Sequence, residues 1–182
     1  MHGTTVAIAL ASLALIWFLS RQAQAAISPS GNASRTLPPM PATIQASTLA
    51  FVRSREGLRL SAYPDGEGYS IGYGHYLGPA PSPASISIAQ ADDMLMQDVN
   101  AAAATLTRIV TAPLTQNQYD ALISFIYNIG ADAFVSSTLL GKLNNRDYTG
   151  AAAEFGRWVY SKGVVVGGLV TRRNVEKNLF LA

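Results

Sequence analysis

Residues 56–75 read EGLRLSAYPDGEGYSIGYGH, and along this stretch the sequence changes from a helical to a strand-like pattern. Before it, Ile44, Leu49, Phe51 and Val52 lie at the spacing of a helical face. Within it, glycines and a proline separate β-type residues, which is typical of strands joined by tight turns. The sequence therefore predicts a helix up to about residue 55, followed by an irregular β-hairpin.

Three polar side chains of this stretch are candidates for one site: Glu56 at the helix end, Asp65 nine residues later in a turn, and Ser70 in the next strand. Glycoside hydrolysis requires one carboxylic acid that protonates the leaving oxygen and one carboxylate that steers water or stabilises an oxocarbenium-like sugar. We expect apolar neighbours to desolvate Glu56, and Asp65 to stay hydrated and ionised in its Pro-Asp-Gly turn. On spacing alone, a surface ion pair of Glu56 with Arg53 or Arg59 and a plain Asx turn at Asp65 are the more frequent outcome.

Helical patterns fill the remainder of the chain. Apolar residues recur at helical spacing over 88–110, and Thr115-Gln-Asn-Gln118 is a capping box whose helix ends at Gly130. Helix start signals predict shorter helices at 138–144, 148–158 and 169–180. The expected fold class is therefore α+β, mostly α.

The N-terminal region has a different composition. Residues 6–19 form an unbroken run of 14 apolar or small residues, and no charged side chain occurs before Arg21. This run is typical of a cleaved signal peptide or of an uncleaved signal-anchor, and Ala23-Gln-Ala25 fits a cleavage site. Four prolines in 27–46 indicate an extended linker. We therefore divide the chain into a signal or signal-anchor (1–26), a linker (27–46) and a catalytic domain (47–182).

Composition narrows the chemistry. The chain has no cysteine and two histidines far apart, so we expect neither a metal site nor a cofactor. His75 has no nucleophile at a suitable spacing, and a structural imidazole bonded to a carboxylate is the better interpretation.

The C-terminal third is basic. Residues 139–182 carry seven basic and three acidic groups, a net charge of +4. Arg157 and Arg172 are candidate substrate-binding residues for an anionic glycan, or they hold the last helix through Glu154 or Glu176. No alternation of aromatic and basic residues accompanies them, so we expect no nucleic-acid partner.

Three segments in order resemble the phage-type lysozymes, the endolysins of glycoside hydrolase family 24. They are Glu56 and Asp65 with GYSIGYGH (68–75), LTQNQYDALISFIYNIG (114–130), and RWVY (157–160) with GLVTRRNVE (168–176). The resemblance covers about 49–182. It implies a lysozyme-like two-lobed domain, with a small β-hairpin lobe and a helical C-terminal lobe joined by the long helix.

The resemblance also implies roles for single residues. Glu56 is the expected general acid, and Asp65 the carboxylate that activates water or stabilises the transition state. Asn128 is either a polar residue of the cleft that contacts the sugar or an ordinary amide at the end of its helix. Ser70 stands in place of the family's threonine, with four residues rather than five between it and Asp65. We therefore rank Ser70 below both carboxylates.

The implied substrate is peptidoglycan, cleaved at β-1,4 bonds between N-acetylmuramic acid and N-acetylglucosamine by a monomer. The N-terminal segment is then the route to the inner membrane or periplasm, and release involves membrane energisation or a holin. Two rivals remain open: a lytic transglycosylase, and a catalytically silent, membrane-tethered glycan-binding module.

Overall fold

A computed structural model describes residues 44–182. The predicted signal segment (1–26) and nearly all of the predicted linker (27–46) lie outside the described residues. Among the helices of the described part, none is both long enough and apolar enough to cross a membrane.

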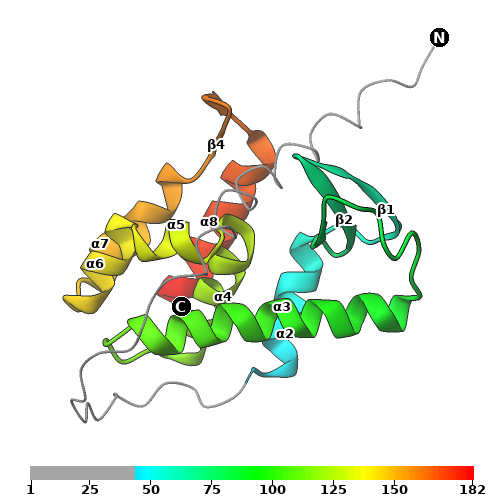
Figure 1. Ribbon diagram of the computed structural model, residues 1–182. Coiled ribbons are helices and arrows are strands. Elements are labelled where there is room, and N and C mark those ends of the chain that lie inside the picture. Colours follow the sequence, from blue (N-terminus) through cyan, green and yellow to red (C-terminus); the bar gives the residue numbers. More distant parts are fainter. Residues whose placement is uncertain (1–43) are drawn as a thin grey trace, which may run out of the picture.

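The elements follow the α+β, mostly helical class that the sequence predicts (Figure 1). In chain order they are α2 (Ala46–Arg55), β1 (Arg59–Asp65), β2 (Gly68–Gly72), β3 (His75–Gly78), α3 (Ile88–Ile109), α4 (Gln116–Ile129), α5 (Ala131–Val135), α6 (Thr138–Asn144), α7 (Tyr148–Glu154), the 3-10 helix η1 (Phe155–Arg157), β4 (Tyr160–Ser161), β5 (Val164–Val165) and α8 (Gly167–Leu181).

The glycine-rich stretch forms a three-stranded antiparallel sheet, ordered β1-β2-β3, where the sequence predicted only a hairpin. A bulge interrupts the β1–β2 register between Arg59 and Tyr63, and Asp65 then pairs with Gly68. Gly68 is required for close packing, because a Cβ there would collide with the carbonyl oxygen of Gly78. The bulge and the tight turn set the direction of the last residues of β1, which carry Asp65.

The two longest helices begin at capping boxes. The side chain of Ser87 accepts from the Gln90 N–H at the start of α3, and Thr115 accepts from the Gln118 N–H at the start of α4. Gly130 ends α4 with φ of 88°, a conformation that favours glycine. The predictions for 88–110 and for the helix that ends at Gly130 are therefore confirmed.

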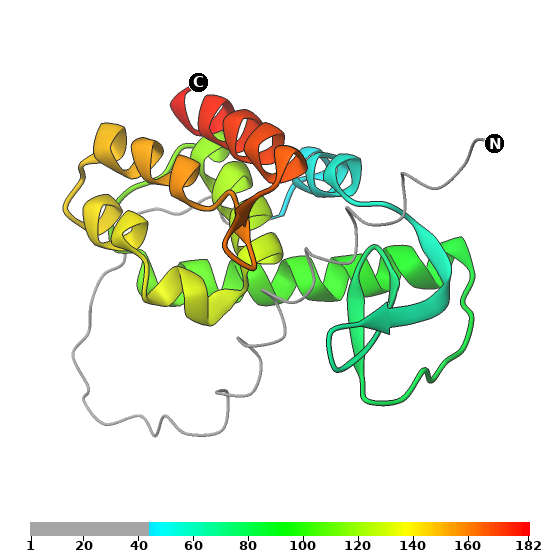
Figure 2. The ribbon, with the colours of Figure 1, turned by 90° about the horizontal axis from the view of Figure 1, so that it is seen from above.

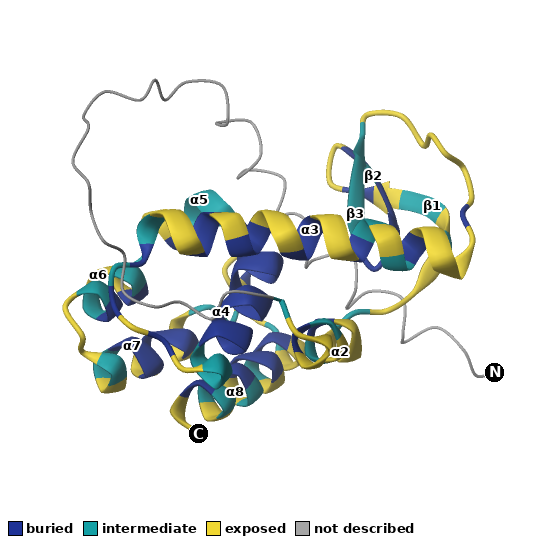
Figure 3. Ribbon diagram, turned by 90° about the horizontal axis from the view of Figure 1, so that it is seen from below, coloured by how far each residue is buried: buried dark blue, intermediate teal, exposed yellow. Residues whose placement is uncertain are grey.

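The core of the helical part surrounds α4. Every residue of α4 from Tyr119 to Ile129 is buried, and the helix contacts α2, α3, α5 and α8 (Figure 3). The sheet stands apart from these helices, and α3 runs past both, as Figure 2 shows from above. Since α2 packs mainly against α3 and α4, the residue that follows it lies between the sheet and the helices.

Two features of the C-terminal part differ from the expected pattern. The segment expected to be one helix over 148–158 forms α7 and then the 3-10 helix η1. The last helix, α8, starts two residues before the expected residue 169. The helix α5 and the hairpin β4–β5 were not predicted, because segments of five and two residues are too short to show a period.

Candidate active site

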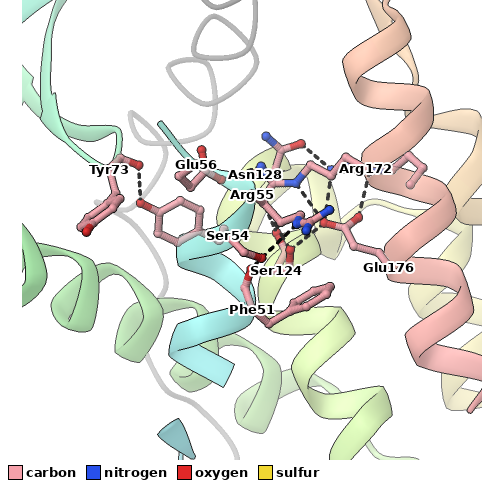
Figure 4. Close-up of polar contacts among 11 residues, drawn as sticks. Phe51, Ser54, Arg55, Glu56, Tyr73, Ser124, Asn128, Arg172 and Glu176 are labelled. Carbon is pink, nitrogen blue, oxygen red and sulfur yellow. Dashed lines mark hydrogen bonds and ion pairs between the residues drawn. The ribbon is translucent and has the colours of Figure 1, made fainter. Parts of the chain in front are cut away.

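Glu56 is the first residue after α2, with an extended backbone (φ −106°, ψ 147°). Its Oε1 accepts a hydrogen bond from Nη1 of Arg172 at 2.5 Å, and the Glu56 side chain is 16% exposed (Figure 4). The expected apolar surroundings are wrong: Leu58 is 40% exposed, and a buried arginine faces the carboxylate. The alternative pairing with Arg53 or Arg59 is wrong as well, because Arg53 pairs with Asp92 and Arg59 stacks over Tyr63.

Arg172 is held in place from α4 and from its own helix. Its Nε donates to Glu176 Oε1 at 3.0 Å, and its Nη2 donates to the carbonyl oxygen of Ser124 at 3.1 Å. Burial acts to lower the pKa of Arg172, but the charges of Glu56 and Glu176 outweigh it and raise the pKa. Arg172 is therefore a fixed positive charge against Glu56.

Asp65 and Ser70 meet across the β1–β2 turn. Ser70 Oγ donates to Asp65 Oδ2 at 2.6 Å, so the shorter spacing still brings the hydroxyl to the carboxylate. The expectation of a hydrated Asp65 is wrong, since the residue is only 5% exposed. Desolvation raises its pKa, against the opposite effect of the Ser70 hydrogen bond. Among the described residues, the buried Asp65 Oδ1 has no hydrogen-bond partner.

Two tyrosines belong to the surroundings of the carboxylates. Burial raises the pKa of Tyr63, and the negative charges of Asp65 and Glu56 act in the same direction. Tyr127 of α4 donates its hydroxyl to the carbonyl oxygen of Tyr73 at 2.8 Å (Figure 4). Burial raises the pKa of Tyr127 well above its usual value, followed by the charge of Glu56. The site therefore joins the sheet to the helices.

The structure separates the three candidate binding residues. Asn128 is buried, and its Oδ1 accepts from Nη2 of Arg173 at 2.6 Å. Asn128 and Arg172 therefore belong to the surroundings of Glu56 (Figure 4). Arg157 is 70% exposed and pairs with Glu154, but both residues precede α8, so this pair does not hold the last helix.

His75 also behaves as the structural interpretation predicted. Its Nδ1 lies 2.9 Å from Asp98 Oδ2. Within residues 44–182, no group of three or more His, Asp or Glu side chains is placed to hold a metal ion.

Sequence analysis missed two residues that hold Arg172 in place behind the site. Ser124 was not singled out, and Glu176 was expected only to hold the last helix. The available signal was helical spacing: Glu176 follows Arg172 by four residues and Arg173 by three, so it can pair with both on one helix.

Comparison with known proteins agrees with this arrangement. The family model "Phage lysozyme" matches residues 53–176, which contain Glu56, Asp65, Ser70 and Arg172. The chain belongs to the phage lysozyme family. Its relatives in this family include endolysins. The endolysin of Bacillus phage PZA is 47% identical over 141 residues, which cover 75% of this chain and 54% of that protein. The chain thus spans about half the length of that relative.

Two further phage lysozyme relatives are informative. The SAR-endolysin of Escherichia phage Mu is 42% identical over 101 residues, covering 56% of this chain and 59% of that protein. Among solved structures, the muramidase domain of SpmX from Asticaccaulis excentricus has a TM-score of 0.71 and 36% identity. That match covers 77% of this chain and 98% of the domain.

Proposed function

We propose that this protein is an endolysin, a muramidase that hydrolyses β-1,4 bonds between N-acetylmuramic acid and N-acetylglucosamine in peptidoglycan. Membership of the phage lysozyme family and the similarity to a muramidase domain support a lysozyme function, that of a glycoside hydrolase. The observation that carries the proposal is the pair of carboxylates in different surroundings: Glu56 against a buried arginine, and Asp65 buried with one oxygen unpaired among the described residues.

In this proposal Glu56 is the general acid. Within residues 44–182, Arg172 bonds to Oε1, which leaves Oε2 to carry the proton to the leaving oxygen. Asp65 then acts on the other reacting group, either water or the oxocarbenium-like sugar. Ser70 donates to Asp65 Oδ2 and thereby holds the carboxylate in place. Asn128 and Arg172 are the proposed binding residues beside Glu56, and Arg157 remains a proposed contact for the more distant, anionic part of the glycan.

The test of the acid is Glu56→Gln. The amide retains the shape and can still accept from Arg172, but it cannot donate the proton at neutral pH, so we expect the rate of peptidoglycan lysis to fall at least ~100-fold. Glu67→Gln is the matched control. Glu67 is an exposed carboxylate in the turn between β1 and β2, so this variant should leave lysis unchanged. Full activity of folded Glu56→Gln contradicts the assignment.

The products separate this function from its rivals. A hydrolase leaves reducing ends, whereas a lytic transglycosylase leaves 1,6-anhydro ends. A silent glycan-binding module leaves the polymer intact. Mass spectrometry of digested peptidoglycan therefore distinguishes all three, and reducing ends that are absent from the Glu56→Gln digest support the muramidase.

For the N-terminal segment, we propose an uncleaved signal-anchor that holds the enzyme at the periplasmic face of the host inner membrane. Relatives named SAR-endolysins support export through such a segment. Release would depend on collapse of the membrane potential, with a holin as the functional partner. Intact-mass measurement of membrane and soluble fractions tests this: a species that begins at Ala26 contradicts the anchor, and a full-length species that becomes soluble on collapse of the potential supports it.

A further inference from the structure

The proposed acid and three charged side chains behind it form a group of four whose formal charges cancel. Glu56 follows α2, whereas Arg172, Arg173 and Glu176 lie on α8. Glu176 is 0% exposed, Arg173 1% and Arg172 5%, so all three α8 charges are removed from solvent. Buried charges are costly unless they are paired, which makes the arrangement of this group specific.

Glu176 is the carboxylate that both arginines share. Its Oε1 accepts from Arg172 Nε at 3.0 Å and from Ser124 Oγ at 2.7 Å (Figure 4). Its Oε2 lies 2.9 Å from Arg173 Nε, an ion pair that is not aligned as a hydrogen bond. Burial lowers the pKa of Arg173 to about 10, and the charge of Glu176 opposes that effect. Glu176 thus compensates two buried cations.

The position of Arg172 presents a chemical problem for an acid. A positive charge in contact with a carboxyl group favours its ionised form, yet a general acid must hold its proton until the glycosidic bond breaks. The second negative charge, on the far side of the same guanidinium, weakens this effect. Arg172 is therefore shared between Glu56 and Glu176.

We propose that Glu176 is a positioning residue of the active site: through Arg172 it fixes the guanidinium against Glu56 and offsets part of the positive charge that Glu56 faces. The inference rests on the proposed function, in which Glu56 is the acid. Within residues 44–182, the charge of Glu56 also acts on three other titratable groups, which are Arg173 of α8, Tyr127 of α4 and Tyr63 of β1. Of the two carboxylates near these arginines, only Glu176 contacts both of them.

The test compares the pH dependence of lysis in variants of the full chain. Glu176→Gln keeps the shape and an acceptor for Ser124 but removes the negative charge. The alkaline limb of the profile, where the acid loses its proton, should move to lower pH by about one unit, so that activity above the limb falls about tenfold. Arg173→Gln removes a positive charge from the same group, and the limb should move to higher pH.

Ser124→Ala is the matched control. It removes the hydroxyl that donates to Glu176 and leaves the backbone carbonyl that accepts from Arg172. No charge changes, so the limb should stay at the wild-type pH even if the melting temperature falls. A role of Glu176 in stability alone would lower activity uniformly across pH without opposite shifts.

Each outcome decides the inference. Opposite shifts in Glu176→Gln and Arg173→Gln support it, whereas a folded Glu176→Gln variant with the wild-type limb, or Ser124→Ala with the same shift, overturns it. If Glu176→Gln does not fold, Arg173→Gln carries the test, because an unchanged or lowered limb there contradicts the proposal. Retained activity in Glu56→Gln is a separate result, and it rejects the proposed acid itself.

Discussion

Asp65 is the buried carboxylate of the site, and its burial has opposite effects on activity and stability. Because desolvation raises the pKa of Asp65 in the folded state above the ordinary 3.8, this residue favours folding at acid pH and loses that contribution as pH rises through the raised pKa. We expect Asp65→Asn to reduce lysis ~100-fold but to increase the melting temperature at pH 7.

Thermal unfolding from pH 3 to pH 7 measures this effect. The advantage of Asp65→Asn over wild type should shrink as pH falls toward 3.8, since both then carry a neutral side chain. The exposed Glu67→Gln variant should show no such trend. A variant less stable than wild type at neutral pH would contradict the assignment of the burial cost to Asp65.

Ser70 acts through Asp65, so its removal should have a smaller effect. Ser70→Ala deletes the donor to Asp65 Oδ2, and a hydrogen bond to a charged group contributes roughly 1.5–3 kcal/mol. We expect about tenfold slower lysis, less than for Asp65→Asn or Glu56→Gln. Steady-state lysis rates check this order, with the exposed Ser61→Ala in β1 as control. If Ser70→Ala is the most damaging of the three, the roles must be reassigned.

At the scale of single residues, the sequence predicted which residues form the site better than it predicted what surrounds each of them. The motif that contains Glu56, Asp65 and Ser70 is contiguous, so local reasoning finds it. The partner of Glu56 lies 116 residues away, and no local pattern connects the two. The Pro-Asp-Gly turn suggested an exposed Asp65, but pairing of Asp65 with Gly68 buries it.

At the scale of elements, Gly130 joins two helices with a backbone that only glycine adopts readily. Its φ is 88°, and it ends α4 and begins α5. We expect Gly130→Ala to reduce the free energy of unfolding by about 1–2 kcal/mol, since an L side chain is strained there. Gly141→Ala is the matched control: Gly141 lies inside α6 with open space around it, and alanine should stabilise by roughly 0.5–1 kcal/mol. Urea denaturation distinguishes the two, and equal effects would contradict the role of φ.

The predicted elements were right where local signals agree. Apolar periodicity predicted α3, and a capping box with a terminal glycine predicted α4. The short elements were missed because they depend on tertiary contacts: β3 exists because β2 offers an edge, and β4 pairs with β5 over two residues each.

At the scale of the whole molecule, a hydrogen bond from Tyr127 of α4 to the carbonyl oxygen of Tyr73 links the helices to the region of the sheet. Tyr127→Phe removes the donor to the buried carbonyl oxygen of Tyr73, so we expect a loss of roughly 1–3 kcal/mol in the free energy of unfolding. Tyr148→Phe removes a similar bond to the carbonyl oxygen of Pro113 at the exposed surface and should have little effect, because water replaces it. Equal losses in urea denaturation would contradict the importance of burial.

The two-lobed arrangement was predicted through the family resemblance rather than from the residues. Helical spacing identifies a long helix over 88–110, but it does not say that α2 packs on α3 and α4. That packing puts Glu56 where α8 reaches it, and it depends on contacts between segments far apart in the chain.

The long sequence separation between Glu56 and Arg172 has a consequence for biosynthesis. A ribosome delivers residue 56 long before residues 172–176, so a nascent chain has the acid without the cation that orients it. Interrupted translation products that stop before α8 should therefore be harmless to the cell that makes them. In the endolysin proposed above, activity then arises with synthesis of the helix that carries Arg172, not with the motif that carries Glu56.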